Sequence, residues 1–136
     1  MVSAAIGIGC RRRVAASAII GLVREALARL ASPPDRVRLF TIERKGDEAG
    51  LIEAATTLGY DLIALPEAQF AGTSADLLAR GVRPSARVRD LVGIDSVAEA
   101  AALLGAGPRA TLLGPRVAAN GVTCAIAIDR SGGDGP

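Results

Sequence analysis

The stretch VSAAIGIGCRRR, residues 2–13, joins an apolar run to two glycines and three consecutive arginines. A short apolar run that ends in glycines is typical of a buried strand, so we expect a strand over residues 2–8. Apolar residues then recur at helical spacing over residues 15–30, ahead of the helix-breaking pair Pro33 and Pro34. The chain therefore begins with a strand, a turn that carries the arginines, and a helix.

The same alternation of strand and helix continues along the chain. RVRLFTIE (36–43) predicts a second strand, and the apolar stripe of residues 51–58, closed by Gly59 as a C-terminal cap, predicts a second helix. DLIAL (61–65) predicts a third strand. Strands that alternate with helices form a parallel sheet with right-handed crossovers, so this β-α-β-α-β order predicts an α/β fold.

The middle of the chain has weaker patterns, which predict short helices around residues 75–79 and 85–91. A clearer helix is expected over residues 97–104. Ser96 and Glu99 have the spacing of a capping box at its start, and glycine and proline residues from position 105 end it.

The last ordered element is expected to be a β-hairpin, because Asn120-Gly121 separates two apolar runs. In the second run, alternate residues from Val122 to Ile128 share one face, Cys124 among them. The sequence thus predicts one α/β domain over residues 1–129, with a parallel β-α-β-α-β core, then short helices and a C-terminal antiparallel hairpin. The segment 130–136 is expected to be a disordered tail.

Composition excludes several classes of function. Aromatic residues make up 2% of the chain and the net charge is +2, so base-stacking surfaces and large basic patches are missing. The chain has no histidine, and its two cysteines lie far apart in sequence, so no metal-binding spacing is present. No apolar stretch is long enough to span a bilayer, and the start lacks the basic residues of a signal peptide. We expect a cytoplasmic protein with no nucleic-acid or membrane partner, no metal and no cofactor.

Two segments fall where ligands bind in open α/β sheets, beyond the carboxyl ends of the parallel strands. GIGCRRR (7–13) follows the first strand and ERKGDE (43–48) follows the second. The first is a poor phosphate loop, because Arg12 stands where a dinucleotide fingerprint has its third glycine and no Lys-Ser/Thr pair follows. Its arginines either clamp carboxylates or form an ordinary solvated turn, and spacing alone does not decide between these.

Individual side chains in these segments have equally open interpretations. Cys10 lies where a helix N-terminus and arginines would lower a thiol pKa, although the missing histidine base favours a small residue in a tight turn. Lys45, the only lysine, is either a ligand contact or an exposed turn residue, and with Glu48 it could form an acid-base pair. Ser85 either caps a helix or faces the same cleft.

Five ordered motifs give the chain a family resemblance. They are GIGCRR (7–12), KxxExGL (45–51), PSxxV (84–88), VGxxSVAEAAAL (92–103) and VTCAIA (122–127). With them the chain resembles the CobE family, which is similar to the C-terminal domain of CbiG in cobalamin biosynthesis. The resemblance covers roughly residues 6–128, and Arg13 departs from it, because a small or polar residue is expected there.

The resemblance implies an α/β domain that acts in corrin-ring assembly, where the precorrin intermediates carry many carboxylates. The first hypothesis is a protein that binds or carries a precorrin or hydrogenobyrinic-type tetrapyrrole and has no catalytic activity of its own. Its ligand-binding residues would be Gly9, Cys10, Arg11, Arg12, Lys45, Glu48 and Ser85.

Two alternatives remain open. One is a hydrolase of the CbiG type, which would act on a lactone or acyl group of a precorrin with Cys10 as nucleophile or Lys45 and Glu48 as acid and base. The other is a scaffold subunit that binds other enzymes of the cobalamin pathway.

Overall fold

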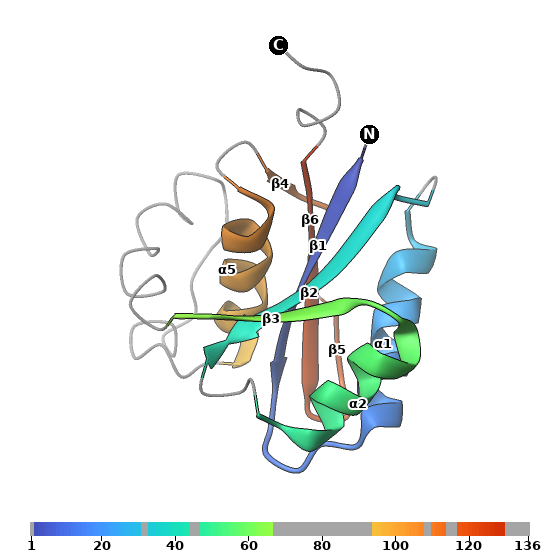
Figure 1. The fold of residues 1–136 in the computed structure, drawn as a ribbon, viewed down its shortest axis with the longest axis vertical. Coiled ribbons are helices and arrows are strands. Elements are labelled where there is room, and N and C mark those ends of the chain that lie inside the picture. The colour runs from blue at the N-terminus through green and yellow to red at the C-terminus, as the bar shows by residue number, and fades with distance from the viewer. Residues whose placement is uncertain are drawn as a thin grey trace.

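The computed structural model describes residues 2–30, 33–43, 47–66, 94–107, 110–113 and 117–129. Its elements follow in the order β1 (Ser3–Cys10), α1 (Ala16–Ala28), β2 (Arg36–Ile42), α2 (Ala49–Leu58), β3 (Asp61–Leu65), α5 (Ile94–Ala106), β4 (Thr111–Leu112), β5 (Val117–Ala119) and β6 (Val122–Asp129). These strands form one mixed sheet with helices on both faces (Figure 1). The short helices predicted around residues 75–79 and 85–91, and the predicted tail at 130–136, lie outside the described residues.

The sheet has the strand order β3-β2-β1-β6-β4, and β5 also pairs with β6. β1, β2 and β3 are parallel neighbours, which confirms the predicted β-α-β-α-β core. β6 runs antiparallel to β1 along its whole length, from Ser3 opposite Asp129 to Cys10 opposite Val122. The start of β6 therefore lies at the same end of the sheet as the end of β1.

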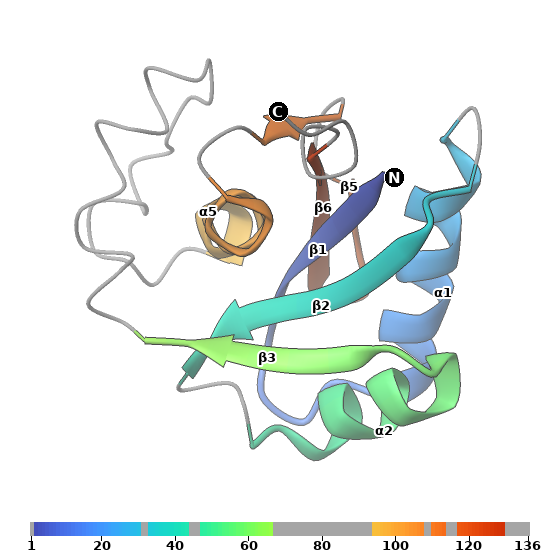
Figure 2. The same cartoon turned by 45° about the horizontal axis from the view of Figure 1, so that its top comes forward.

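Figure 2 shows α5 on one face of the sheet and α1 and α2 on the other. An apolar cluster on each face holds these helices to the sheet. Because the chain crosses from β1 to β2 to β3 in one direction, α1 and α2 lie together on one face. Ile6, Ile8 and Ile126 belong to the cluster under these two helices. Alternate residues of the same strands, such as Ala125 and Ala127, pack on the opposite face with α5. β1 and β6 are therefore buried on both faces.

Gly7 allows α5 to pack directly against the backbone of β1. A Cβ atom at Gly7 would lie 2.6 Å from the backbone nitrogen of Ala102 and 2.9 Å from the carbonyl carbon of Ala98. Both distances are below ordinary van der Waals contact, so only glycine fits between β1 and this helix. Glycine as a packing residue was one sequence interpretation of this segment, and the structure confirms it for the face that α5 covers.

Several sequence-based boundaries need correction. β1 continues to Cys10 instead of ending at residue 8, so Cys10 is not a turn residue. α1 ends at Ala28, before the prolines that were expected to stop it. α5 begins at Ile94, which places Ser96 inside the helix and makes the predicted N-cap wrong.

The hairpin prediction is confirmed, with one change. Asn120 and Gly121 join β5 to β6 with φ values of 54° and 82°, both positive as in a type I′ turn. The apolar run before the turn is not one strand, because β4 and β5 are separate elements that pair with different parts of β6. Gly59 ends α2 in the left-handed conformation, as the sequence predicted.

Candidate functional site

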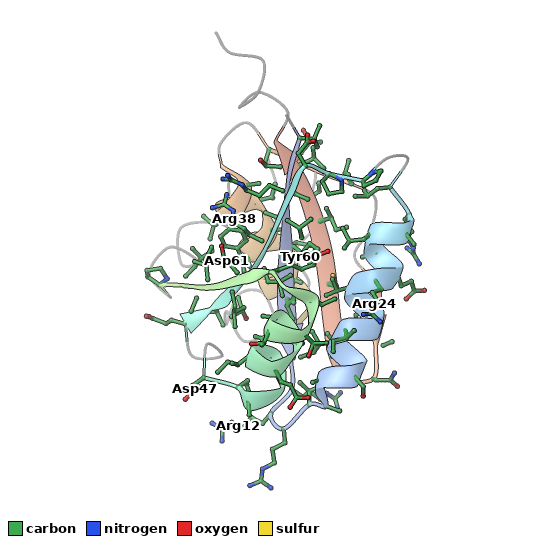
Figure 3. All side chains as sticks on the ribbon, turned by 45° about the vertical axis from the view of Figure 1, so that its right-hand side comes forward. Arg12, Arg24, Arg38, Asp47, Tyr60 and Asp61 are labelled. Carbon is green, nitrogen blue, oxygen red and sulfur yellow. The ribbon has the colours of Figure 1, made fainter. Side chains whose placement is uncertain are left out.

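The ends of β1 and β2 and the starts of α1, α2 and β6 meet at one end of the sheet. We call this end the carboxyl edge and define it by Arg11–Arg13, Glu48 and Asn120–Gly121. The backbone N–H of Arg11 donates to the carbonyl oxygen of Gly121 at 3.0 Å, which ties the first turn to the hairpin. In Figure 3, Arg12 and Asp47 lie at this lower end of the molecule, whereas Arg24 lies further along α1.

The three arginines form the exposed turn that the sequence placed after the first strand. All three are exposed, and the residue that follows them, Val14, is half-buried. Arg13 adopts a positive φ of 60°, a left-handed conformation that favours glycine or asparagine. This conformation would favour the small or polar residue that the family resemblance led us to expect at this position, and arginine adopts it at a cost in backbone strain.

Glu48 connects the two turns of the carboxyl edge. It is the N-cap residue of α2, but its carboxylate accepts a hydrogen bond of 3.2 Å from the backbone N–H of Arg13. Two residues later, a Cβ atom at Gly50 would overlap the carbonyl oxygen of Val14, so α2 begins directly against the β1–α1 turn. The structure thus gives Glu48 a bond that holds the arginine turn in place.

Helix N-termini add to the electrostatic field at this edge. Neither α1, with N-cap Ala15, nor α2 has a side chain that caps its own N-terminus, and neither first turn contains an acidic residue. The partial positive charge of the α1 start is therefore available to an anion, whereas the α2 start already carries the carboxylate of its N-cap residue Glu48. Over residues 11–13 and 43–48 the sequence has five basic and three acidic side chains, a net charge of +2.

The two cysteines are buried thiols on the face covered by α1. Cys10 is 1% exposed and belongs to the apolar cluster there, which argues against its role as a nucleophile. Cys124 lies opposite Ile8 on the neighbouring strand, and burial raises the pKa of its thiol to about 12. Cys124 is therefore a core residue, as its place in the apolar run predicted.

β1 and β2 separate near the carboxyl edge. Their pairing ends at Gly7 opposite Phe40, although both strands continue. Beyond that point the hydroxyl of Thr41 donates to the carbonyl oxygen of Ile8 at 2.8 Å and bridges the strands. Gly9 pairs on its other side with Thr123 of β6.

Lys45 and Ser85, two of the predicted ligand contacts, lie outside the described residues and stay predictions. Gly9, Cys10, Arg11, Arg12 and Glu48 are brought to the carboxyl edge, with Cys10 turned into the core. Among the residues that the structure describes, no three His, Cys, Asp or Glu side chains gather as a metal-binding group. In the same residues, no helix has the length and apolar character needed to cross a membrane.

Comparison with known proteins identifies the family. The model of the family described as cobalamin synthesis G C-terminus (CbiG C-terminus) matches residues 4–127, which is nearly all of the sheet and its helices. The chain belongs to the CbiG C-terminal family. This finding confirms the resemblance drawn from the five motifs, and it makes the chain a cobalamin biosynthesis protein of the CobE and CbiG C-terminal type.

Two named proteins are similar in sequence to most of this chain. Protein CobE of Sinorhizobium sp. is 33% identical over 90% of this chain and 77% of its own length. A cobalt-precorrin-5A hydrolase of Priestia megaterium is 32% identical over 91% of this chain, but the match spans only 32% of that longer protein.

Two solved structures have the same fold. The crystal structure of CobE, described as a protein of the cobalamin biosynthetic pathway, superposes with a TM-score of 0.76 at 33% identity, covering 94% of this chain and 91% of CobE. The cobalamin biosynthesis protein chiG of Agrobacterium tumefaciens superposes with a TM-score of 0.72 at 34% identity, covering 94% and 99%.

The sequence analysis missed one polar residue near this edge. Thr123 is 2% exposed in a strand whose other residues from Val122 to Ile128 are apolar. The signal was available, because a single hydroxyl inside the run VTCAIA interrupts an otherwise apolar alternation. It was overlooked because only one face of this strand was expected to be buried.

Proposed function

We propose that the chain binds a polycarboxylate tetrapyrrole, a precorrin or hydrogenobyrinic-type intermediate, at the carboxyl edge and carries it without transforming it. The observation that carries this proposal is the exposed turn Arg11–Arg13, which lies directly before the N-terminus of α1, where no side chain caps the helix. Guanidinium groups match carboxylates in shape and charge, and helix N-termini favour anions. Membership in a cobalamin biosynthesis family supplies a ligand class with many carboxylates.

The arginines alone would give modest affinity. An ion pair with an exposed arginine contributes about 0.2–1 kcal/mol and is weakened by salt. Several carboxylates must therefore be bound at once, together with apolar contact to the ring. A ligand with one or two carboxylates should bind far more weakly than a tetrapyrrole with many.

The test is a titration with hydrogenobyrinic acid, a coloured corrin polycarboxylate, followed by absorbance. The double variant Arg11→Gln, Arg12→Gln should weaken binding by about 5- to 30-fold, from two pairs at 0.5–1 kcal/mol each. Adding Lys45→Gln should weaken it further if Lys45 faces the same ligand. The matched control is Arg24→Gln, which removes an exposed arginine about 12 Å further along α1.

The control should bind as the unchanged chain does. Equal affinities for the double variant and the control would show that the arginine turn is not the binding site. Binding that is insensitive to salt would also contradict a site built on exposed charges.

A hydrolase acting on a precorrin is the second candidate, because a relative bears the name cobalt-precorrin-5A hydrolase. Two geometric facts favour the carrier over it: Cys10 is buried, and the carboxylate of Glu48 already accepts a hydrogen bond from Arg13. Mass spectrometry of the bound ligand separates the two, since a hydrolase changes its mass and a carrier does not. If the chain neither binds nor changes the ligand, the remaining hypothesis is a scaffold that binds other enzymes of the pathway.

A further inference from the structure

The arginine turn is exposed, yet its backbone is fixed at both ends by elements that are distant in the sequence. At its start, the N–H of Arg11 donates to the carbonyl oxygen of Gly121 at 3.0 Å. The aliphatic part of the Arg11 side chain also lies against Gly121, with its carbon atoms 3.4–3.8 Å from the place that a Cβ there would occupy. At its end, the N–H of Arg13 donates to the carboxylate of Glu48 at 3.2 Å. The N–H of Arg12, between these two bonds, makes no hydrogen bond to another described residue.

The second of these bonds holds a strained conformation. Arg13 has a φ of 60°, in the left-handed region that an arginine adopts only at a cost. Strained backbone persists where the surrounding structure fixes it, and it is concentrated at functional sites. The side chain that fixes it here comes from another element, the start of α2. This arrangement is more than an ordinary surface turn requires.

The negative charge of Glu48 is the other unexpected feature. A carboxylate beside three exposed arginines repels an anionic ligand and so lowers its affinity. An acid at this position is understandable if its bond to Arg13 contributes more to binding than its charge removes. A mobile turn loses conformational freedom when it binds carboxylates, and that loss weakens binding. A turn that is already fixed avoids the loss.

We propose that Glu48 is a positioning residue, which holds the backbone of Arg13 and thereby fixes the arginine turn for a polycarboxylate without touching the ligand. This inference rests on the proposed function and replaces the interpretation of Glu48 as a ligand contact or as part of an acid-base pair. The start of α2 is well placed for the role. Its Gly50 lies directly against the backbone of Val14, so Glu48 is itself fixed relative to the turn.

The variants Glu48→Gln and Glu48→Ala test the role, because both remove the same negative charge and only glutamine keeps a side-chain oxygen that can accept the N–H. In a titration with hydrogenobyrinic acid, Glu48→Gln should bind at least as tightly as the unchanged chain. Glu48→Ala should bind at least about fivefold more weakly than Glu48→Gln, because its turn must become ordered on binding. Since the two variants have equal charge, this difference should be the same at low and at physiological salt.

The matched control is the same pair of changes at Glu53, an exposed acid further along α2. Glu53→Gln and Glu53→Ala should bind the ligand equally, because the Glu53 carboxylate makes no hydrogen bond to another described residue.

Hydrogen exchange followed by NMR measures the order of the turn itself. In the ligand-free unchanged chain, the amides of Arg11 and Arg13 should exchange more slowly than that of Arg12. Glu48→Ala should lose this protection at Arg13, and saturating hydrogenobyrinic acid should restore it. A residue that only stabilised α2 would not couple the exchange of Arg13 to the ligand.

The possible outcomes separate this inference from the proposed function. Equal affinities of Glu48→Gln and Glu48→Ala, or equally fast exchange of Arg12 and Arg13 in the unchanged chain, would overturn the positioning role and leave the proposed function standing. Weaker binding by Glu48→Gln than by the unchanged chain would make the carboxylate a direct contact and would overturn the role as well. If the unchanged chain does not bind the ligand at all, the proposed function and this inference both fail.

Discussion

Replacing Gly7 by alanine should be among the most damaging single-methyl changes in this chain. The added Cβ would lie 2.6 Å from the Ala102 nitrogen and 2.9 Å from the Ala98 carbonyl carbon, against contacts of about 3.5 Å or more between unstrained atoms. The obstructing atoms belong to the helix backbone and cannot rotate away as a side chain would. α5 would therefore have to move by roughly an ångström from a sheet on which it buries an alanine-rich face. Overpacking costs about 1–3 kcal/mol of unfolding free energy, and we expect the upper end of that range here because the obstructing atoms are backbone.

The matched control is Gly21→Ala, the same chemical change at an exposed position of α1. A Cβ at Gly21 meets no atom within 4 Å, and alanine is favoured over glycine inside a helix by about 0.5–1 kcal/mol. Urea unfolding followed by far-UV circular dichroism should therefore show opposite signs, with Gly7→Ala less stable and Gly21→Ala more stable than the unchanged chain. If both variants shift the free energy of unfolding equally, or if Gly7→Ala is neutral, the close packing of α5 on β1 is refuted.

Two further changes test the backbone of the turn and the buried thiol. Arg13→Gly should stabilise the chain by up to about 1 kcal/mol, because glycine adopts the positive φ of this position without strain. The control Arg12→Gly should not stabilise it. Equal shifts in the Tm of the two variants would contradict the left-handed conformation of Arg13. Burial raises the pKa of Cys124, so between pH 9 and about 12 only the unfolded thiol releases its proton. The contribution of this thiol to the free energy of unfolding is therefore retained below pH 9. It is lost as pH rises toward 12, by up to about 1.4 kcal/mol per pH unit. Urea unfolding at pH 8–10.5 should show a shallower decline for Cys124→Ala, and parallel declines would show that the thiol is not protected by burial.

The parallel strands β1, β2 and β3 could be predicted from the sequence because the patterns that indicate them are local. DLIAL was predicted as residues 61–65 and forms β3 over those residues, since a helix cap precedes it and Pro66 follows it. The Asn120-Gly121 hairpin is equally local, because both residues tolerate the positive φ that the turn requires. The sequence does not reveal that β6 pairs with β1 along its full length, since partners more than a hundred residues apart leave no local pattern. That pairing is what extends β1 to Cys10 and buries its thiol.

Part of the candidate site could likewise be predicted from the sequence, and part could not. The placement of the arginines beyond the first strand was predicted correctly from their position after an apolar run. The hydrogen bond from Arg13 to Glu48 was not predicted, because it joins two turns that only the assembled sheet brings together. Thr123 required knowledge that both faces of β6 are covered, which depends on where α5 packs.

The measurement that tests the central claim most directly is a titration of the whole chain with hydrogenobyrinic acid at low and at physiological salt, with the mass of the ligand recorded afterwards. We predict saturable binding that weakens as salt increases, with a ligand of unchanged mass. A ligand whose mass has changed would make the protein an enzyme, and a chain that leaves the absorbance of the ligand unaltered at every concentration would contradict the account.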